Sequence, residues 1–212
     1  MHLTNSLTWS KSSPKIFWGE IAPCDHVVQI YEDKEVFFDT LAGFVGDGIN
    51  SGDCIIVIAR KAHLKELESR LKAHAVSVKS LISENQYLAI DANEALEQFM
   101  VDGWPDEAKF RVFVSNLLKK AYKKDRPVRA FGEMVALLWE QGHQGATVNL
   151  EHLWNAFLAT ESFKLFCAYP KSGFTQNPDE SMAHICTSHS MMIDGKRDSP
   201  EILYKKVDNV SI

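Results

Sequence analysis

The stretch CIIVIA, residues 54–59, is apolar at every position. A strand with one wet face alternates apolar and polar residues, whereas a strand covered on both faces is apolar throughout. The stretch therefore predicts a central strand of a parallel sheet with helices on both sides. The turn Ser51-Gly52-Asp53 precedes this strand and ends the helical pattern before it.

Strand-like and helix-like patterns alternate on both sides of this stretch. Further strands are predicted at Val27–Tyr31, Gln86–Ile90, Val128–Phe131 and Phe163–Tyr169. Helices are predicted at Lys34–Asn50 and Ala62–His74, and two more begin near Asn93 and at Pro105. A further helix ends near Trp139, and the last follows a cap at Thr147. Asp91 is expected to cap the helix near Asn93. Strands separated by helices favour right-handed crossovers, which predicts an α/β three-layer sandwich with a mainly parallel central sheet flanked by helices.

The ends of the chain are less regular than its centre. Residues 1–23 are polar with scattered aromatics and are expected to form an N-terminal arm. Residues 24–192 are expected to form the folded domain, with one more helix within Pro178–Met192. Residues 193–212 are polar and are expected to be a peripheral tail.

Composition excludes several classes of protein. The 212 residues have a formal net charge of −5, which gives no general electrostatic reason to bind nucleic acid or an anionic membrane. No apolar run is long enough to span a bilayer, and the N-terminus lacks the apolar core of a signal peptide. The four cysteines are far apart and are expected to be free thiols in a reducing cytosol. A cytoplasmic location is therefore expected.

A carboxylate follows the strand at Val128–Phe131. The residues Gly132-Glu133-Met134 come directly after it, and ligands of open parallel sheets bind beyond the carboxyl ends of the strands. Glu133 is thus a candidate polar anchor for a ligand. It could instead cap the next helix or pair with Arg129 or another cation. Tyr31 ends the first strand at the same edge and is a second candidate, or else a half-buried tyrosine.

Two further groups of residues could line a ligand pocket. Glu151 and Asn155 are spaced i, i+4 and share a helix face, where they form a polar wall or bond to each other. Trp139 and Trp154 lie in the two helices that follow Glu133. These rings line either an apolar cavity or a well-packed core.

The segment His184-Ile-Cys-Thr-Ser-His189 has the residue types of a zinc site. Its two imidazoles and the Cys186 thiol are suitable ligands, and the fourth would be water or another protein residue such as His152, His143 or Cys24. The same residues are otherwise a helix face packed on the core. No metal and no other cofactor are expected.

ATP hydrolysis is not expected from this sequence. The nearest match to a phosphate loop is Gly43–Gly48, but Ile49 and Asn50 follow where a lysine and a hydroxyl are needed. The match also lies inside a predicted helix. The residues after the first strand, Glu32-Asp33-Lys34-Glu35, would repel a triphosphate.

The order of several short motifs resembles the MEDS domain, the methanogen/methylotroph sensory domain of dichloromethane-responsive regulators and some histidine kinases. The motifs are His26–Tyr31, Phe44 with Gly48-Ile49 and Gly52-Asp53, Asp91-Ala92, Arg129–Met134, Leu150-Glu151 with Asn155, and Cys167–Tyr169. The resemblance covers residues 25–192 and implies a fold related to RecA and the circadian-clock ATPases, here without the phosphate loop. It also implies detection of small organic compounds, including hydrocarbon derivatives.

The expected function is that of a non-enzymatic sensor domain in signal transduction. A small organic ligand would bind at the carboxyl ends of the strands, and the expected ligand-binding residues are Tyr31, Arg129, Glu133, Trp139, Glu151, Asn155 and Tyr169. The chain has no recognisable kinase or helix-turn-helix region, so its partner would be a separate histidine kinase or transcription regulator. One alternative is a nucleotide-binding or hydrolytic enzyme that uses Glu133. Another is a pure protein-interaction module, and a homodimer is plausible in each case.

Overall fold

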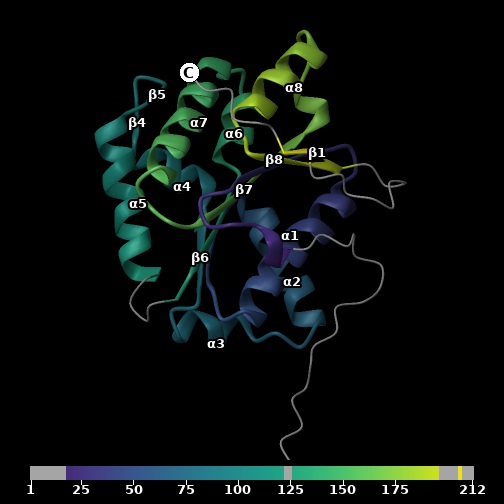
Figure 1. Cartoon of the computed structure of the whole chain (residues 1–212), viewed down its shortest axis with the longest axis vertical. Coiled ribbons are helices and arrows are strands. Elements are labelled where there is room, and N and C mark those ends of the chain that lie inside the picture. Colours follow the sequence, from purple (N-terminus) through teal and green to yellow (C-terminus); the bar gives the residue numbers. More distant parts are fainter. Residues whose placement is uncertain (1–17, 122–125, 196–204, 207–212) are drawn as a thin grey trace, which may run out of the picture.

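The computed structural model describes residues 18–121, 126–195 and 205–206. Six parallel strands form its central sheet, in the order β3 (Tyr87–Asp91), β2 (Cys54–Ala59), β6 (Val128–Gly132), β7 (Lys164–Pro170), β1 (His26–Tyr31) and β8 (Met191–Gly195). The short strand β9 (Lys205–Lys206) pairs antiparallel with β8 at one edge. This arrangement confirms the expected α/β three-layer sandwich with a mainly parallel sheet (Figure 1).

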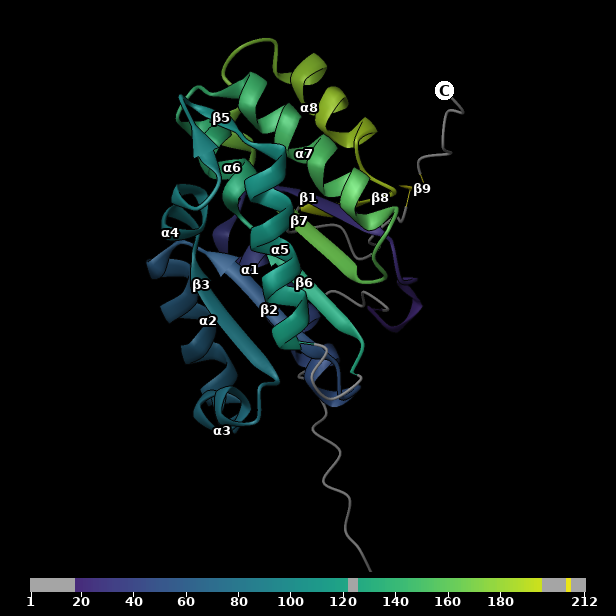
Figure 2. The same cartoon turned by 90° about the vertical axis from the view of Figure 1, so that its left-hand side faces the viewer.

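Helices cover both faces of the sheet (Figures 1 and 2). One face has α1 (Lys34–Asn50), α2 (Lys61–Ala73) and α3 (Val78–Ser83), and the other has α4 (Ala92–Glu97), α5 (Glu107–Ala121), α6 (Met134–Glu140), α7 (Gln144–Leu158) and α8 (Pro178–Thr187). Short elements complete the fold: two 3-10 turns, Trp18–Glu20 and Lys171–Gly173, and a hairpin of β4 (Met100–Val101) with β5 (Trp104–Pro105). No helix in the described ranges combines the length and hydropathy that a membrane span needs.

The strand β2 has the double burial that its sequence predicts. All six of its residues are buried, and their side chains alternate between the two cores. Ile56 and Ile58 pack with α4, α5 and α6, whereas Ile55 and Val57 pack with α1 and α2. An apolar run without alternation is thus the signature of a strand between two helical layers.

Two predicted helix starts differ from the structure. Thr147 does not cap α7, which begins at Gln144 after the left-handed Gly142 and the N-cap residue His143. Its hydroxyl is buried, 3.2 Å from the carbonyl oxygens of both Val135 and His143. Pro105 belongs to the β4–β5 hairpin, and α5 begins after Asp106, whose carboxylate accepts from the amide of Lys109. The cap at Asp91 is confirmed.

The chain ends pack more closely than the sequence predicts. The expected late helix is α8, but it ends at Thr187, and β8 then adds a parallel strand that extends past Met192. Ile193 is buried in the core on the α1 side. Trp18 and Ile21, from the expected N-terminal arm, are buried there as well. Residues 1–17 of the expected arm and residues 196–204 and 207–212 of the expected tail lie outside the described residues.

Candidate functional site

Glu133 occupies the first position beyond β6, where an open parallel sheet would bind a ligand. Its carboxylate is buried and makes no capping bond to α6. One oxygen accepts from the backbone N–H of Arg60, at 3.0 Å, and the other forms an ion pair with the Arg60 guanidinium Nε, also at 3.0 Å. The Nδ1 of His63 lies 2.9 Å from the same carboxylate. Glu133 therefore pairs with Arg60, which lies between β2 and α2, and contacts His63 of α2, and it does not pair with Arg129.

Tyr31 lies at the same end of the sheet. Its ring is buried and stacks on Phe37 with a centroid distance of 4.6 Å. Burial raises the pKa of the Tyr31 phenol, and the negative charges of Glu133 and Glu140 raise it further. Tyr31 is thus close enough to Glu133 to feel its charge, while the hydrogen-bond and ion-pair partners of that carboxylate are Arg60 and His63.

Arg129 lies at the opposite end of the sheet from Glu133. Its guanidinium forms ion pairs with Asp53, at 2.5 Å, and with Asp47, at 2.7 Å, and its side chain is 1% exposed. These partners come from the start of β2 and the end of α1. Arg129 joins elements at the amino ends of the strands and does not share a site with Glu133.

Trp139 belongs to an aromatic cluster below the 3-10 turn at Lys171–Gly173. Its indole N–H donates to the Gly173 carbonyl at 3.0 Å, and its ring lies 5.1 Å from that of Phe174. Trp154 packs edge-on against Phe110 at 4.9 Å. These aromatic side chains are packed core in the described structure.

The three remaining candidates, Glu151, Asn155 and Tyr169, meet at a second buried position. Glu151 belongs to a group that we call the His–Cys–Glu cluster, which consists of His26, Glu151, Cys167 and His189, and Asn155 and Tyr169 contact this cluster. One ligand-type atom from each member lies within 4.8 Å of those of the others, and all four side chains are buried. Asn155 accepts from His26, and Tyr169 donates a short hydrogen bond to Glu151.

The cluster combines residues far apart in sequence. His26 begins β1, Cys167 lies in β7, Glu151 lies in α7, and His189 follows α8. Of the zinc candidates in the α8 segment, only His189 reaches it, because His184 is exposed and the Cys186 thiol lies 3.2 Å from the Met192 sulfur. The local signals of this site in the sequence are the i, i+4 spacing of Glu151 and Asn155 and the ligand-type segment that ends at His189.

Burial favours the neutral forms of these groups. It raises the pKa of Glu151 to about 8, against the lowering effect of the Tyr169 hydrogen bond. It lowers the pKa of His26 to about 4, against the raising effect of Asn155, and it also lowers the pKa of His189. The pKa of the Cys167 thiol is raised by burial and by the nearby Glu151. Strongly perturbed groups that cluster in one place indicate a candidate site.

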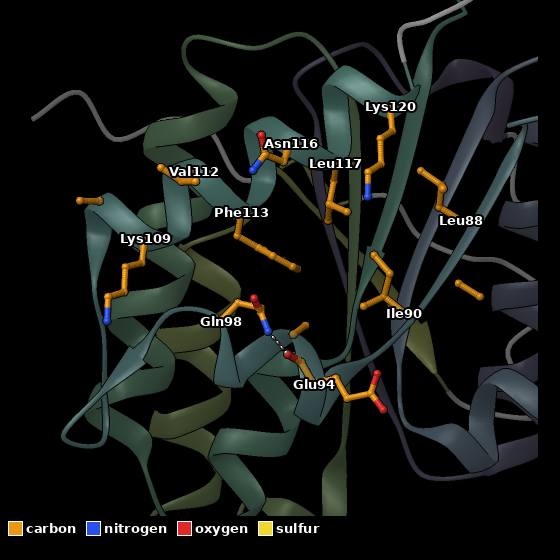
Figure 3. Close-up of a pocket in the computed structure, with 13 residues that line it drawn as sticks. Leu88, Ile90, Glu94, Gln98, Lys109, Val112, Phe113, Asn116, Leu117 and Lys120 are labelled. Carbon is orange, nitrogen blue, oxygen red and sulfur yellow. Dashed lines mark hydrogen bonds between the residues drawn. The ribbon is translucent and has the colours of Figure 1, made fainter.

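A separate groove opens between β3, α4 and α5 (Figure 3). This α5 groove has a volume of about 760 Å³ and is lined by Leu88, Ala89, Ile90, Glu94, Ala95, Gln98, Ala108, Lys109, Val112, Phe113, Asn116, Leu117 and Lys120. Leu88 and Ile90 project from the edge strand toward Phe113 and Leu117 of α5. The groove was not predicted from the sequence, because Phe113 and Leu117 belong to an apolar helix stripe that predicts a closed helix contact.

A family model for the MEDS domain, described as "MEthanogen/methylotroph, DcmR Sensory domain", matches residues 25–190. No curated protein matches the chain.

Two solved structures from Pyrococcus horikoshii are similar in fold. The protein PH0250 from strain OT3 has 14% identity and a TM-score of 0.62, with 90% of each chain covered. The uncharacterized protein PH0321, solved in complex with an unknown peptide, has 10% identity and a TM-score of 0.61, with 83% of this chain and 79% of that chain covered. At these identities the likeness shows the fold alone.

Proposed function

The chain belongs to the MEDS family of sensory domains, and we propose that it is a non-enzymatic sensor that binds a small, largely apolar organic molecule in the α5 groove. The groove is the observation on which this proposal rests. Its volume of about 760 Å³ lies within the range of small-molecule pockets. Apolar walls with a few polar groups at the rim are also typical of such pockets.

The carboxyl ends of the strands offer a less favourable position for an apolar ligand. There a ligand would have to displace Arg60 or His63 from Glu133, or separate the stacked rings of Tyr31 and Phe37. In the groove, by contrast, the side chains of Leu88, Ile90 and Phe113 leave open space between them. Binding in the groove requires no internal ion pair to break.

The β1–α1 connection supports a sensor over a nucleotide-binding enzyme. Only Glu32 and Asp33 separate the two elements, and Asp33 accepts from the amide of Glu35 at 2.8 Å. A phosphate at a helix N-terminus needs free backbone N–H groups there. The segment Gly43–Gly48, the nearest match to a phosphate loop, lies inside α1.

The output of the sensor would pass through the surface beside the groove. Three of the four exposed large apolar side chains among the described residues lie there or just before α5: Val101, Trp104 and Val112. A ligand that draws α5 toward β3 would change the shape of this surface. A signalling partner such as a histidine kinase or a transcription regulator would respond to that change.

A second candidate function uses the same surface without a small ligand. The apolar side chains Val101, Trp104 and Val112 are 39%, 55% and 62% exposed. Exposed apolar patches mark interaction sites. The peptide bound to PH0321 shows that a protein of this fold can bind a peptide. A pure interaction module would bind a protein segment along the groove.

The two functions are separated by titrating ¹⁵N-labelled protein with short halogenated alkanes and alcohols. For the sensor, the backbone resonances of Leu88–Ile90 and of α5 shift and saturate. The variant Val112→Asp, which places a charge in the groove, weakens binding at least tenfold. The matched control Ile82→Asp, on exposed α3 outside the groove, leaves it unchanged. Shifts that are absent, or that Val112→Asp does not affect, contradict the proposal, and a tight response to ATP with Mg²⁺ favours the enzyme instead.

A further inference from the structure

The His–Cys–Glu cluster leaves polar atoms without partners in a place that water does not reach. Oε2 of Glu151 and Nε2 of His189 are buried and make no hydrogen bond. The side chains of both residues are 0% exposed. A buried polar atom without a partner is costly, and each such atom in a folded protein requires an explanation.

Hydrogen bonds fix which nitrogen of each imidazole has the lone pair. Nδ1 of His189 lies 2.7 Å from the carbonyl oxygen of Ile185, which can only accept. Nδ1 of His26 lies 2.9 Å from Oδ1 of Asn155, and the Asn155 amide nitrogen donates to Ser188. Both Nδ1 atoms are therefore donors, so both Nε2 atoms direct lone pairs into the cluster.

The inward-facing atoms have the spacing of metal ligands. Nε2 of His26 lies 3.3 Å from Sγ of Cys167 and 3.5 Å from Oε2 of Glu151, and Nε2 of His189 lies 3.6 Å from Oε1 of Glu151. In a tetrahedral zinc site with ordinary bond lengths, the ligand atoms lie about 3.3–3.8 Å from one another. The other distances between ligand atoms of the cluster are at most 4.8 Å, and small side-chain movements would shorten them to this range.

We infer that His26, Glu151, Cys167 and His189 bind a divalent metal ion, with Zn²⁺ as the ion that this ligand set favours. Two imidazoles, one thiolate and one carboxylate suit zinc, and four protein ligands form the closed coordination of a structural site. On binding, the Cys167 thiol and the Glu151 carboxyl release their protons. The two negative charges then balance the ion, so the buried group is neutral overall.

Outer contacts support the ligands in the manner of known metal sites. Ligating histidines donate their second N–H to a carbonyl or carboxylate, and ligating carboxylates are hydrogen-bonded in turn. Ile185 and Asn155 supply the first kind of contact, and Tyr169 supplies the second. The ion would join β1, β7 and α7 to the α8–β8 segment, which holds the edge of the sheet.

Metal analysis of the tag-free full chain tests this inference. We expect about one zinc per chain, and X-ray absorption of the zinc protein shows one sulfur and three nitrogen or oxygen neighbours. After exchange for Co²⁺, the wild-type protein shows a thiolate-to-cobalt charge-transfer band. Cys167→Ser abolishes this band, whereas Cys186→Ser, which changes a half-buried cysteine outside the cluster, retains it. Asn155→Ala keeps the band and lowers the Co²⁺ affinity about 10–100-fold.

The absorption measurement uses the wild-type protein, so it stands even where a variant fails to fold. The inference is overturned by a chain that holds no stoichiometric zinc or cobalt. It is equally overturned by a metal whose neighbours include no sulfur, or by a charge-transfer band that Cys186→Ser removes and Cys167→Ser does not. None of these results depends on whether the α5 groove binds a ligand.

Discussion

Arg60 is joined to Glu133 twice, by its backbone N–H to Oε2 and by its guanidinium Nε to Oε1, each at 3.0 Å. The two residues follow β2 and β6, neighbouring strands of the sheet. One carboxylate thus fixes the start of α2 against the start of α6. The Arg60 side chain also reaches Glu140 at 2.9 Å, near the end of α6.

Replacement of Glu133 should destabilise the protein. Glu133→Ala leaves His63 and the Arg60 guanidinium without their buried partner, and we expect a loss of about 3 kcal/mol in the free energy of unfolding. Glu140→Ala removes a 31% exposed partner of the same arginine and should cost less than about 1 kcal/mol. Urea denaturation measures both values. Equal losses would show that burial of Glu133 does not set the energy of this network.

The sequence predicts the sheet well because its signals are local. The apolar run at 54–59 marks β2, and Asp91 caps α4 as expected. The strand β8 is missed because it is short, follows polar residues and gains its place only by pairing with β1.

The sites are less predictable because their contacts are remote in sequence. The partners of Glu133 lie about 70 residues away, at Arg60 and His63. The His–Cys–Glu cluster unites residues from 26 to 189, so local spacing indicates Glu151 with Asn155 and, separately, His189, but not that they meet His26 and Cys167. The residue types that suit a site can be read from a sequence, whereas the order of the strands decides which of these residues lie close together.

Asp91 should contribute more to the free energy of unfolding than an ordinary helix cap does. Its Oδ1 accepts from the amides of Asn93 and Glu94 at the start of α4, and its Oδ2 accepts from the amide of Lys61 at the start of α2. We expect Asp91→Ala to destabilise the protein by about 2 kcal/mol, because both helices lose a cap. Asp33→Ala, which uncaps α1 alone, should cost about 1 kcal/mol. Chemical denaturation of the two variants provides the comparison, and a smaller loss for Asp91→Ala would contradict the double cap.

Stability should fall in alkali because buried tyrosines, Tyr31 and Tyr87 among them, resist ionisation. Burial is the main cause that raises the pKa of Tyr31 and of Tyr87 above the ordinary value of 10.0. The unfolded chain loses these protons near pH 10 and the folded protein does not, so the stability that they give is complete below that pH and declines above it. These tyrosines should therefore ionise only as the protein unfolds. The phenolate absorbance and the circular dichroism of the protein should then change over the same pH range. Tyr31→Phe should remove one late-titrating group, and ionisation near pH 10 in a folded protein would refute the expectation.

Gly48→Ala should destabilise the protein although it lies in a helix. An alanine in place of a helical glycine usually adds about 0.5–1 kcal/mol of stability. Here the new Cβ would lie 2.4 Å from Cδ1 of Ile55 and 2.8 Å from Cδ of Arg129, both of which are fully buried. Overpacking of this kind costs about 1–3 kcal/mol, so the net change should be a loss.

Gly145→Ala in α7 is the matched control for this overpacking. Its Cβ would lie 2.9 Å from the Trp104 ring, but that ring is 55% exposed and can turn away. This variant should be neutral or stabilised by up to about 1 kcal/mol. Thermal unfolding of the two variants gives the sign of each change. A stabilised Gly48→Ala would mean that Ile55 and Arg129 can move, and that the contact between α1 and the amino ends of the strands is looser than their burial indicates.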